Sequence, residues 1–549
     1  MSESERFRTK TIPQVIKEAA HKWPDKVAIK FKGQAITYRE QYHKICSLAK
    51  GLQNLGIKKG GHVATLLGGC PEWFYISYAI TTLGAVIVPI NVTFIYEELR
   101  YVLRHSDAKA LIMTDKFRGI HYIDLIKEVI PEIDDSTPGF LESKNCPSLK
   151  TVISLSEDKK EYAGCFNFSD VIGSGVNYSH TEINRLIENV KPEDPSYILF
   201  TSGSTAFPKP VLRSHGSNVG IAYYMNGDTN SDDIVLGYQP FYHVGGCIYA
   251  TLGSALFGTS IALMEYFEPG EALKIIEQEK VTKIGGFETH FTTLSSHPNF
   301  KESALSSVRK VTLACGPEWY DKVKKLGLRN RSLVHHYGFT EGTGVVMPPG
   351  ETDETIRKYS NGKPFPGVQI KIINPETGTP LPANTPGEIC LKGWTLFLGY
   401  YKMPKETAAS FDEEGYFRTG DYGWLDEKGY VYYRGRYKQM IKTGGENVSE
   451  REVEMFLESH PLLKTVQVVG VPDPKWGEAV TAIVEPHTGS NLTIEDIKFF
   501  CKGKISGFKI PKYVVTIEKT EWPITPTGKY NKQALREIAI ERLGVKLAK

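Results

Sequence analysis

The chain has 549 residues, a formal net charge of +3 and a hydrophobic content of 41%. These values are typical of a globular protein with several domains and argue against a disordered or fibrous chain. The charge is nearly neutral for this length, so it indicates neither a nucleic-acid-binding surface nor one for an anionic membrane.

The cysteines and the start of the chain bear on the compartment. The 8 cysteines include no C-x-x-C pair, which argues against a disulfide framework or a zinc cluster. The first ten residues, MSESERFRTK, are charged and lack the apolar core of a signal peptide. We therefore expect a cytoplasmic protein.

Two long uncharged stretches, residues 73–96 and 234–264, are long enough to cross a bilayer. Both contain hydroxyl side chains, glycine and proline, and the second also contains His243. Each fits a buried helix followed by a buried strand, since strands of a parallel sheet are apolar on both faces. We therefore expect no membrane span.

Helical and strand patterns alternate from residue 12 to about residue 345. Residues 38–55 predict an amphipathic helix, and 62–67, 111–113 and 151–155 predict short strands. Residues 130–150 read as a loop by their Pro, Ser, Asp and Asn content. This alternation predicts parallel sheets with helices on both faces.

The pattern changes twice along the remaining chain. From about residue 360, short strands separated by Gly, Pro and Asn predict a small β-barrel-like region. After residue 435, a helix at 449–459, capped by Ser449, is followed by strands at 465–470 and 479–484. We predict an α/β fold with a large N-terminal domain, residues 1–435, and a small α+β C-terminal domain, residues 436–549.

The segment that points most directly to chemistry is residues 197–215, YILFTSGSTAFPKPVLRSH. An apolar strand runs directly into five small residues, Thr201–Thr205, whose hydroxyls and N–H groups can bind phosphate oxygens. Lys209 adds a positive charge. The spacing differs from that of a Walker loop, and a Ser/Thr-rich surface loop is the alternative interpretation.

Five further motifs follow this segment. They are YGFTE (337–341), YFRTGD (416–421), GRYK (435–438), GGEN (444–447) and PITPTGK (523–529). Together with residues 197–215 they resemble, in the same order, the motifs of the adenylate-forming superfamily of acyl-CoA synthetases, adenylation domains and luciferases. The resemblance extends over nearly the whole chain.

The resemblance implies a nucleotide site. Glu341 would bind Mg²⁺ through its carboxylate, together with phosphate oxygens. Thr340 would offer a hydroxyl to the α-phosphate, Tyr337 an aromatic face to adenine, and Asp421 two acceptor oxygens to the ribose hydroxyls. The full set of residues expected to bind nucleotide is Thr201, Ser202, Gly203, Ser204, Thr205, Lys209, Gly316, Pro317, Tyr337, Gly338, Phe339, Thr340, Asp421 and Arg436.

The resemblance also assigns roles in the C-terminal domain. Lys529 would be the catalytic lysine, whose ammonium stabilises the negative charge that develops on the transferring group. Lys438 would be the hinge about which this domain rotates. Gly444 and Gly445 would line the tunnel for the pantetheine arm of CoA, where only a hydrogen side chain leaves room.

His243, in the segment PFYHVGG (240–246), would contact the carboxylate or gate the acyl site; a satisfied core histidine is the alternative. Amino-acid-activating members of the superfamily carry an aspartate near this position, and this chain has none, which favours a plain carboxylic acid. The expected acyl pocket consists of small residues, which suits an apolar acid of moderate size: Gly245, Gly246, Gly285, Gly286 and Gly344.

Three departures from the superfamily pattern stand out. Ala206 and Pro210 replace glycines of the phosphate loop, and alanine resists positive φ while proline lacks an N–H. Residues 287–289, Phe-Glu-Thr, replace Val-Pro-Thr near the acyl pocket. Residues 314–317, ACGP, replace Gly-Gly-Ala-Pro beside adenine.

We therefore predict an AMP-forming acid–thiol ligase that uses ATP, Mg²⁺, CoA and a small carboxylic acid, in a reaction that is reversible in principle. Three alternatives stay open: an enzyme that loads a carrier protein, a luciferase-like oxygenase, and a nucleotide-binding protein without turnover. No nucleic-acid partner is expected, and the sequence does not indicate the oligomeric state.

Overall fold

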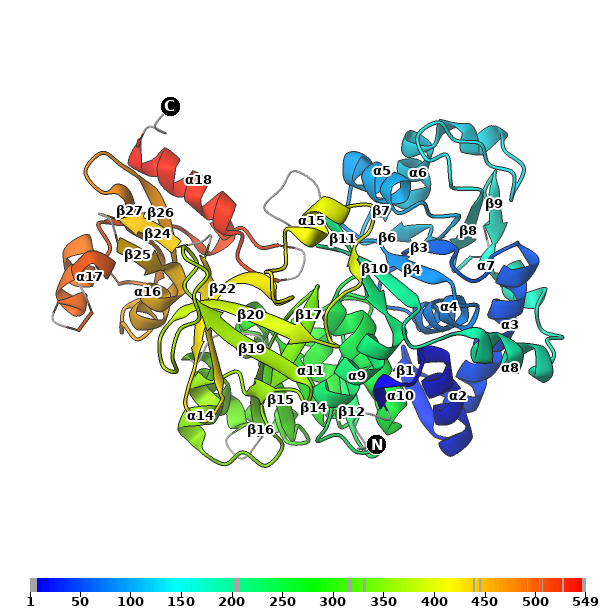
Figure 1. Ribbon diagram of the computed structural model, residues 1–549, viewed down its shortest axis with the longest axis horizontal. Helices are drawn as coiled ribbons and strands as arrows, with labels where there is room; N and C mark the ends of the chain where they lie inside the picture. Colours follow the sequence, from blue (N-terminus) through cyan, green and yellow to red (C-terminus); the bar gives the residue numbers. More distant parts are fainter. Residues whose placement is uncertain are drawn as a thin grey trace.

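The computed structural model describes residues 7–158, 160–201, 208–313, 318–328, 332–437, 440–443, 446–490, 492–502, 504–505, 507–525 and 528–545. Two large sheets with covering helices form most of the N-terminal part (Figure 1). A small antiparallel sheet and a separate C-terminal sheet complete the structure. The predicted α/β architecture, with a large first part and a small second part, is confirmed.

The first large sheet contains eight strands, of which the central ones are parallel. Its order is β21 (Gly399–Tyr400), β11 (Lys209–Ser214), β10 (Pro195–Thr201), β4 (Val86–Pro89), β3 (His62–Leu66), β5 (Ala110–Thr114), β8 (Thr151–Leu155) and β9 (Cys165–Asn167).

The second large sheet contains nine strands and is parallel from β1 to β16. Its order is β18 (Lys363–Pro364), β17 (Gly342–Val346), β16 (Ser332–Phe339), β15 (Lys310–Leu313), β14 (Lys283–Gly286), β12 (Ile234–Gly237), β13 (Ser260–Leu263), β1 (Val27–Phe31) and β2 (Gln34–Thr37).

Helices of this part connect the strands and cover the sheets. They are α2 (Ile12–Lys22), α3 (Tyr38–Asn54), α4 (Pro71–Thr82), α5 (Tyr96–His105), α6 (Tyr122–Val129), η1 (Pro131–Asp135), α7 (Phe168–Gly173), α8 (His180–Asn189), α9 (His215–Met225), η2 (Gly245–Ala250), α10 (Thr251–Phe257), α11 (Pro269–Gln278), α12 (Glu288–Ser295), η3 (Glu302–Leu305), α13 (Glu318–Val323) and η4 (Lys324–Leu328). A two-stranded ribbon, β6 (Lys116–Phe117) and β7 (Ile120–His121), precedes α6.

The uncharged stretches are buried helix–strand pairs, as predicted. Along α4 every residue except Glu72 is buried, because the helix contributes to one apolar core that takes side chains from both large sheets. Trp73 of α4 stacks on Phe241, with ring centroids 4.2 Å apart. Among the described helices, none is long and apolar enough to cross a membrane. The stacking of Trp73 instead fixes the segment that carries His243.

The predicted all-β region is a four-stranded antiparallel sheet. Its order is β19 (Val368–Ile373), β20 (Gly387–Gly393), β22 (Phe417–Leu425) and β23 (Val431–Arg436). Two short helices, α14 (Glu354–Tyr359) and α15 (Pro404–Ala408), lie before and within this region.

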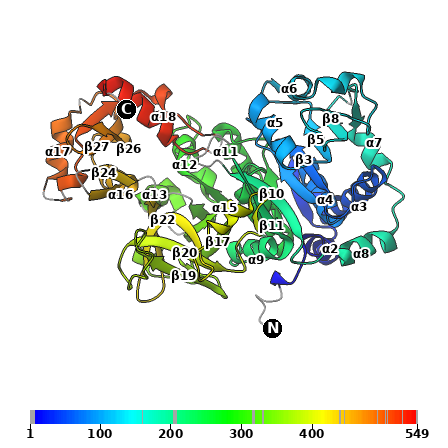
Figure 2. The ribbon, with the colours of Figure 1, turned by 45° about the horizontal axis from the view of Figure 1, so that its top comes forward.

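The C-terminal sheet has the order β25 (Glu446–Ser449), β24 (Met440–Thr443), β27 (Gly477–Pro486) and β26 (Leu463–Asp473), with β28 (Tyr513–Thr516) beside β27. Its helices are α16 (Glu450–Leu457), α17 (Ile494–Cys501), η6 (Gly507–Lys509), η7 (Lys519–Glu521) and α18 (Lys532–Leu543). Ser449 caps α16 as predicted, since its hydroxyl accepts the N–H of Glu452. This unit forms its own body beside the N-terminal part in both views (Figures 1 and 2).

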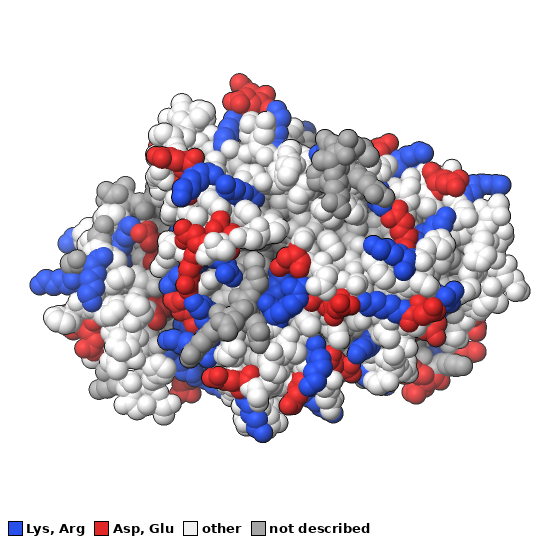
Figure 3. All heavy atoms as spheres, turned by 90° about the horizontal axis from the view of Figure 1, so that it is seen from below, with Lys and Arg blue, Asp and Glu red and all other residues white. Residues whose placement is uncertain are grey.

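Lys and Arg side chains alternate with Asp and Glu across the face shown in Figure 3. No large area of one sign is visible on that face. The picture agrees with the nearly neutral net charge, which gives this face no electrostatic attraction for a polyanion.

Candidate active site

The residues predicted from motifs meet where parallel strands end. Thr201 closes β10, the segment with His243 follows β12, Gly286 closes β14, and Phe339 closes β16. Ligands of open α/β sheets bind at the carboxyl ends of the strands, because the connecting loops converge there. Three of these segments lie at one edge of the second large sheet, and a hydrogen bond from Arg213 of β11 to the Thr340 carbonyl joins that edge to the first sheet. Motifs that are more than 100 residues apart in the chain are thus brought together.

The phosphate loop connects two paired strands. Thr201 and Lys209 are cross-strand partners in the antiparallel pair β10–β11. Ser202, Gly203, Ser204, Thr205 and Ala206, predicted to bind or shape phosphate contacts, lie outside the described residues. Lys209 places its ammonium 4.8 Å from the centre of the Tyr400 ring.

Pro210 lies inside strand β11, beyond the loop. Its carbonyl accepts the N–H of Tyr401 at 2.8 Å. In an antiparallel ladder the N–H and C=O of one residue point to the same neighbour. The donor that proline lacks would therefore point toward β21 and not toward bound phosphate.

Thr340 and Glu341 form the two-residue turn between β16 and β17, so Glu341 does not begin a helix. The turn is held by Arg213, whose side chain is fully buried and donates to the carbonyl of Thr340 at 2.8 Å. The same guanidinium donates to Asn218 at 2.7 Å and to Ser217 at 3.1 Å. Burial lowers the pKa of Arg213. Arg213 is not among the site residues predicted from the sequence, although it belongs to the segment 197–215.

Glu341 is suited to a divalent cation that is bound mainly by phosphate. Its Oε1 accepts the hydroxyl of Tyr400 at 2.7 Å, which orients the carboxylate. In the described part of the chain, no three His, Cys, Asp or Glu side chains lie together as a metal cage would require. Mg²⁺ commonly binds one or two carboxylates and takes its other ligands from phosphates and water, so the donors present fit this ion.

Asp421 and Arg436 are cross-strand partners on β22 and β23. Arg436 Nε lies 3.1 Å from Asp421 Oδ1, and the hydroxyl of Tyr337 donates to Oδ2 at 2.7 Å. Oδ1 is buried and accepts no hydrogen bond of good geometry from the described residues. A buried acceptor in this state needs a partner, and a ribose hydroxyl would supply one.

Tyr337 is almost completely buried and stacks on Tyr433, with ring centroids 5.3 Å apart. The structure therefore gives it the function of orienting Asp421, and its stacking on adenine stays a prediction. Its neighbours Gly338 and Phe339 continue β16, and Phe339 stacks on Phe417 at 5.3 Å.

His243 is neutral near pH 7. Burial lowers its pKa to about 4, helped by the positive charge of Lys529 and by His336. Its Nδ1 accepts the N–H of Gly245 at 3.2 Å, so the neutral ring carries its proton on Nε2. His243 can therefore donate one hydrogen bond from Nε2 without bringing a positive charge.

The five glycines of the expected acyl pocket do not share one environment. A Cβ on Gly245 or Gly285 would meet the Gln239 side chain, at 2.6 and 3.4 Å. The other three allow close packing: a Cβ on Gly246 would lie 2.3 Å from the Pro240 carbonyl, one on Gly286 2.6 Å from the Tyr238 hydroxyl, and one on Gly344 2.6 Å from Leu391. Only Gly245 and Gly285 face a common polar side chain.

Lys529 lies in a tight turn that docks on α12. The turn is closed by hydrogen bonds between Thr525 and Lys529, and Gly528 has a φ of +83°. The carbonyl of Gly528 accepts the hydroxyl of Thr289 at 2.6 Å, and the ammonium of Lys529 lies 4.8 Å from the centre of the Phe287 ring. The segment 287–289, noted above as a departure, thus contacts the lysine turn.

Besides the residues of the phosphate loop, five further predicted site residues lie outside the described residues, and their roles stay predictions. They are Gly316 and Pro317 beside adenine, Lys438 at the hinge, and Gly444 and Gly445 in the CoA tunnel.

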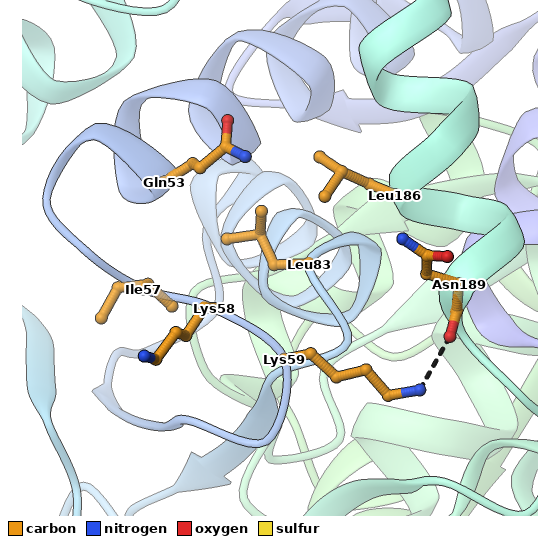
Figure 4. Close-up of a pocket in the computed structure, with 7 residues that line it drawn as sticks. All are labelled: Gln53, Ile57, Lys58, Lys59, Leu83, Leu186 and Asn189. Carbon is orange, nitrogen blue, oxygen red and sulfur yellow. Dashed lines mark hydrogen bonds between the residues drawn. The ribbon is translucent and has the colours of Figure 1, made fainter.

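A separate pocket of about 300 Å³ lies on the first large sheet (Figure 4). Its lining residues are Gln53, Ile57, Lys58, Lys59, Leu83, Leu186 and Asn189. Lys59 donates to the Asn189 carbonyl at 2.7 Å. The pocket lies at the amino ends of β3 and β4, which begin just after Lys59 and Leu83, and so away from the motif residues.

Comparison with known proteins agrees with this geometry. The AMP-binding enzyme family matches residues 16–401, and the AMP-binding enzyme C-terminal domain matches residues 452–529. YngI of Bacillus subtilis (strain 168), a protein named as an acyl-CoA synthetase, is 34% identical over 97% of this chain and 97% of its own length. The mitochondrial medium-chain acyl-CoA ligase of Homo sapiens is 31% identical over 97% of this chain and 88% of its own.

The chain belongs to the AMP-binding enzyme family of adenylate-forming proteins. Among solved structures, the anthranilate CoA ligase AuaEII in complex with anthranoyl-AMP superposes with a TM-score of 0.85 at 22% identity, covering all of both chains, and supports the fold. The family match and the acyl-CoA synthetase relatives together show that the protein is an acid–thiol ligase of the acyl-CoA synthetase type. Its substrates include ATP and CoA.

Changing Asp421→Asn tests how much the buried, charged carboxylate lowers the free energy of unfolding. Burial raises the pKa of Asp421 to about 6, and the charge of Arg436 opposes this increase. The protonated form therefore stabilises the folded state below about pH 4, and this contribution is lost as the pH rises through 6. We expect the variant to gain stability relative to the parent between pH 4 and 6, by at most about 3 kcal/mol.

The same change should weaken ATP binding by about tenfold or more, since a charged acceptor is lost. Thermal unfolding across this pH range and an ATP titration measure the two effects. Glu427→Gln, which alters an exposed carboxylate nearby, is the control and should change neither. Equal pH dependence of unfolding in the parent and the Asp421 variant would contradict the assignment.

Proposed function

We propose that this protein is an AMP-forming carboxylic acid–CoA ligase in which Lys529, His243, Glu341 and Asp421 act at one site. The observation that carries the proposal is the docking of the lysine turn on α12: the Thr289 hydroxyl donates to the Gly528 carbonyl at 2.6 Å, and the Lys529 ammonium lies 4.8 Å from the centre of the Phe287 ring. Burial lowers the pKa of His243 and His336, and the positive charge of Lys529 lowers both further. These contacts support a catalytic role for Lys529 beside the motif residues of the N-terminal part.

In the first step an oxygen of the carboxylate bonds to the α-phosphorus of ATP, and the bond from that phosphorus to the β-phosphate oxygen breaks. Asp421 and Arg436 hold the ribose end, and Lys529 stabilises the charge on the transferring group. His243 donates from Nε2 to an anionic oxygen. When bound through Glu341, Mg²⁺ would neutralise charge on the phosphates. The products are acyl-adenylate and pyrophosphate.

In the second step the thiolate of CoA bonds to the acyl carbon, and the bond to the AMP oxygen breaks. Because Lys529 would act in the first step, residues 436–549 would then rotate about Lys438 and bring Gly444 and Gly445 to the CoA tunnel. Both steps are reversible in principle. Loading of a carrier protein is the second candidate, and a luciferase-like oxygenase the third.

The substrate class remains part of the proposal. The mitochondrial relative is named for medium-chain acids, and the absence of an acidic residue at positions 240–246 favours a plain acid over an amino acid. A cytoplasmic location also remains a prediction from the sequence.

Pyrophosphate–ATP exchange with short, medium, branched, cyclic and aromatic acids, with and without CoA, tests the function. We expect exchange with at least one acid and a thioester once CoA is added. Lys529→Ala should lower exchange by about 10²–10³-fold, since one preorganised charge is removed. Lys519→Ala, an exposed lysine of the same domain, is the control.

Each alternative gives a different result in this experiment. Exchange without thioester would favour a carrier protein, and oxygen uptake would favour the oxygenase. ATP binding without exchange for any acid would contradict the ligase.

Changing Thr289→Val tests the contact between the two parts. Valine keeps the shape of threonine and removes the hydroxyl that donates to Gly528. We expect pyrophosphate–ATP exchange to fall by up to about tenfold, the value of one hydrogen bond. Thioester formation from supplied acyl-adenylate should be unchanged, because the contact is absent from the proposed second arrangement.

Thr293→Val is the matched control, one helical turn further along α12. The Thr293 hydroxyl donates to the Thr289 carbonyl within its own helix, so both half-reactions should keep their rates. An equal loss of both half-reactions in Thr289→Val would show a general destabilisation instead of a contact that is specific to the first step.

A further inference from the structure

Gln239 places an amide between two walls of the expected acyl site. One wall is η2, represented by Gly245, and the other is β14, represented by Gly285. A Cβ on Gly245 would lie 2.6 Å from Gln239 Oε1, and a Cβ on Gly285 would lie 3.4 Å from Gln239 Nε2. The side chain thus spans the space that these glycines leave open.

The amide has unused hydrogen-bonding capacity. Gln239 is half-buried, and among the described residues its side chain has no hydrogen-bond partner, so its amide stays open to water or to a ligand. A primary amide offers two donors and two acceptor lone pairs, which a bound ligand can satisfy in place of water. Because the Gln239 amide lies in the expected acyl site, the bound carboxylic acid is a suitable hydrogen-bond partner for it.

The amide lies close to the reacting end of the substrate. A single point, the Cβ position of Gly245, is 2.6 Å from Gln239 Oε1 and 3.5 Å from His243 Nδ1. His243 is in turn within the electrostatic influence of Lys529. A carboxylate between His243 and Lys529 would therefore place its first few carbons beside Gln239.

More polar groups lie along the η2 wall. The hydroxyl of Tyr249 bonds to that of Thr343, and the Tyr249 ring meets His336 edge-on with centroids 6.1 Å apart. Burial lowers the pKa of His336 to about 4, so this ring is neutral at pH 7. The site thus presents neutral hydrogen-bonding groups, in contrast to the apolar lining expected from the glycines.

We propose that Gln239 is a specificity-determining residue that hydrogen-bonds a hydroxyl or keto oxygen on one of the first carbons after the carboxylate. The substrate class is then a short or aromatic oxygenated acid. A neutral amide can donate to either oxygen and accept from a hydroxyl. This inference rests on the proposed ligase function.

Pairs of acids that differ only by a methyl group in place of the oxygen test the inference. Suitable pairs are 3-hydroxybutanoate with 3-methylbutanoate, 2-hydroxybutanoate with 2-methylbutanoate, and 2-hydroxybenzoate with 2-methylbenzoate. The measured quantity is the ratio of kcat/KM within each pair. We expect the parent to prefer the oxygenated acid at least tenfold in one pair, since an unpaired site amide penalises the methyl analogue.

Gln239→Met keeps the length of the side chain and removes the amide. The ratio should fall at least tenfold through loss of activity on the oxygenated acid, while activity on the methyl analogue is kept. A purely structural defect would lower both acids equally and leave the ratio unchanged. Gln239→Leu serves as a second variant, and Gln53→Met, in the remote pocket of Figure 4, as the control.

Two results would overturn the inference, and they differ in whether the ligase function also fails. Activity on acids with no preference for oxygen in any pair, or a ratio unchanged by both Gln239 variants, would overturn the role of Gln239 and leave the ligase intact. No exchange with any acid, in protein that binds ATP, would overturn the ligase and the inference together.

Discussion

The buried cation of Arg213 is the interaction on which the geometry of the site depends. Among the described residues its three hydrogen-bond acceptors are uncharged, and none is a carboxylate. A buried charge without an ionic partner is costly, and the surrounding dipoles offset only part of that cost. Here the guanidinium joins β11 and α9 to the turn of Thr340 and Glu341. Its charge also acts on Glu341, so the carboxylate proposed to bind the metal ion lies beside a fixed positive centre.

A second constraint is the way in which the sheets share one core. Trp73 and Phe241 stack across the boundary between a helix of the first sheet and the segment that follows β12. Substituting either ring would leave a cavity in this core and would move His243. The position of His243, proposed to lie at the acyl end of the site, thus depends on packing that no motif describes.

The local sequence pattern was sufficient to predict much of the fold. The helix α3, the strands β3 and β8 and the cap at Ser449 follow from periodicity and hydrogen-bonding chemistry over a few residues. The order of the motifs predicts the family, and the contacts between the two large sheets bring the motifs together. Contacts between distant residues could not be predicted in this way: nothing local to Gln239 indicates that it faces Gly285.

Thr289 and Gly344 are two further examples of contacts between distant residues that the sequence alone does not predict. Thr289 belongs to a segment that departs from the superfamily pattern, and its contact with Gly528 depends on how two domains meet. Gly344 is expected in the acyl pocket from the resemblance, and a Cβ at this position would also lie 2.6 Å from Leu391 of β20. A small residue can mark a ligand or a close neighbour, and sequence alone does not separate the two.

The pairing of Asp421 with Arg436 has a thermodynamic consequence. Arg436 ends β23 and lies two residues before the proposed hinge, so one side chain connects the proposed ribose site with the approach to that hinge. Linkage is reciprocal: if domain rotation changes the position of Arg436, it changes nucleotide affinity, and bound nucleotide changes the rotational equilibrium by the same factor. Replacement of bound ATP by AMP would then shift the rotational equilibrium of the C-terminal domain, and no second ligand would be needed.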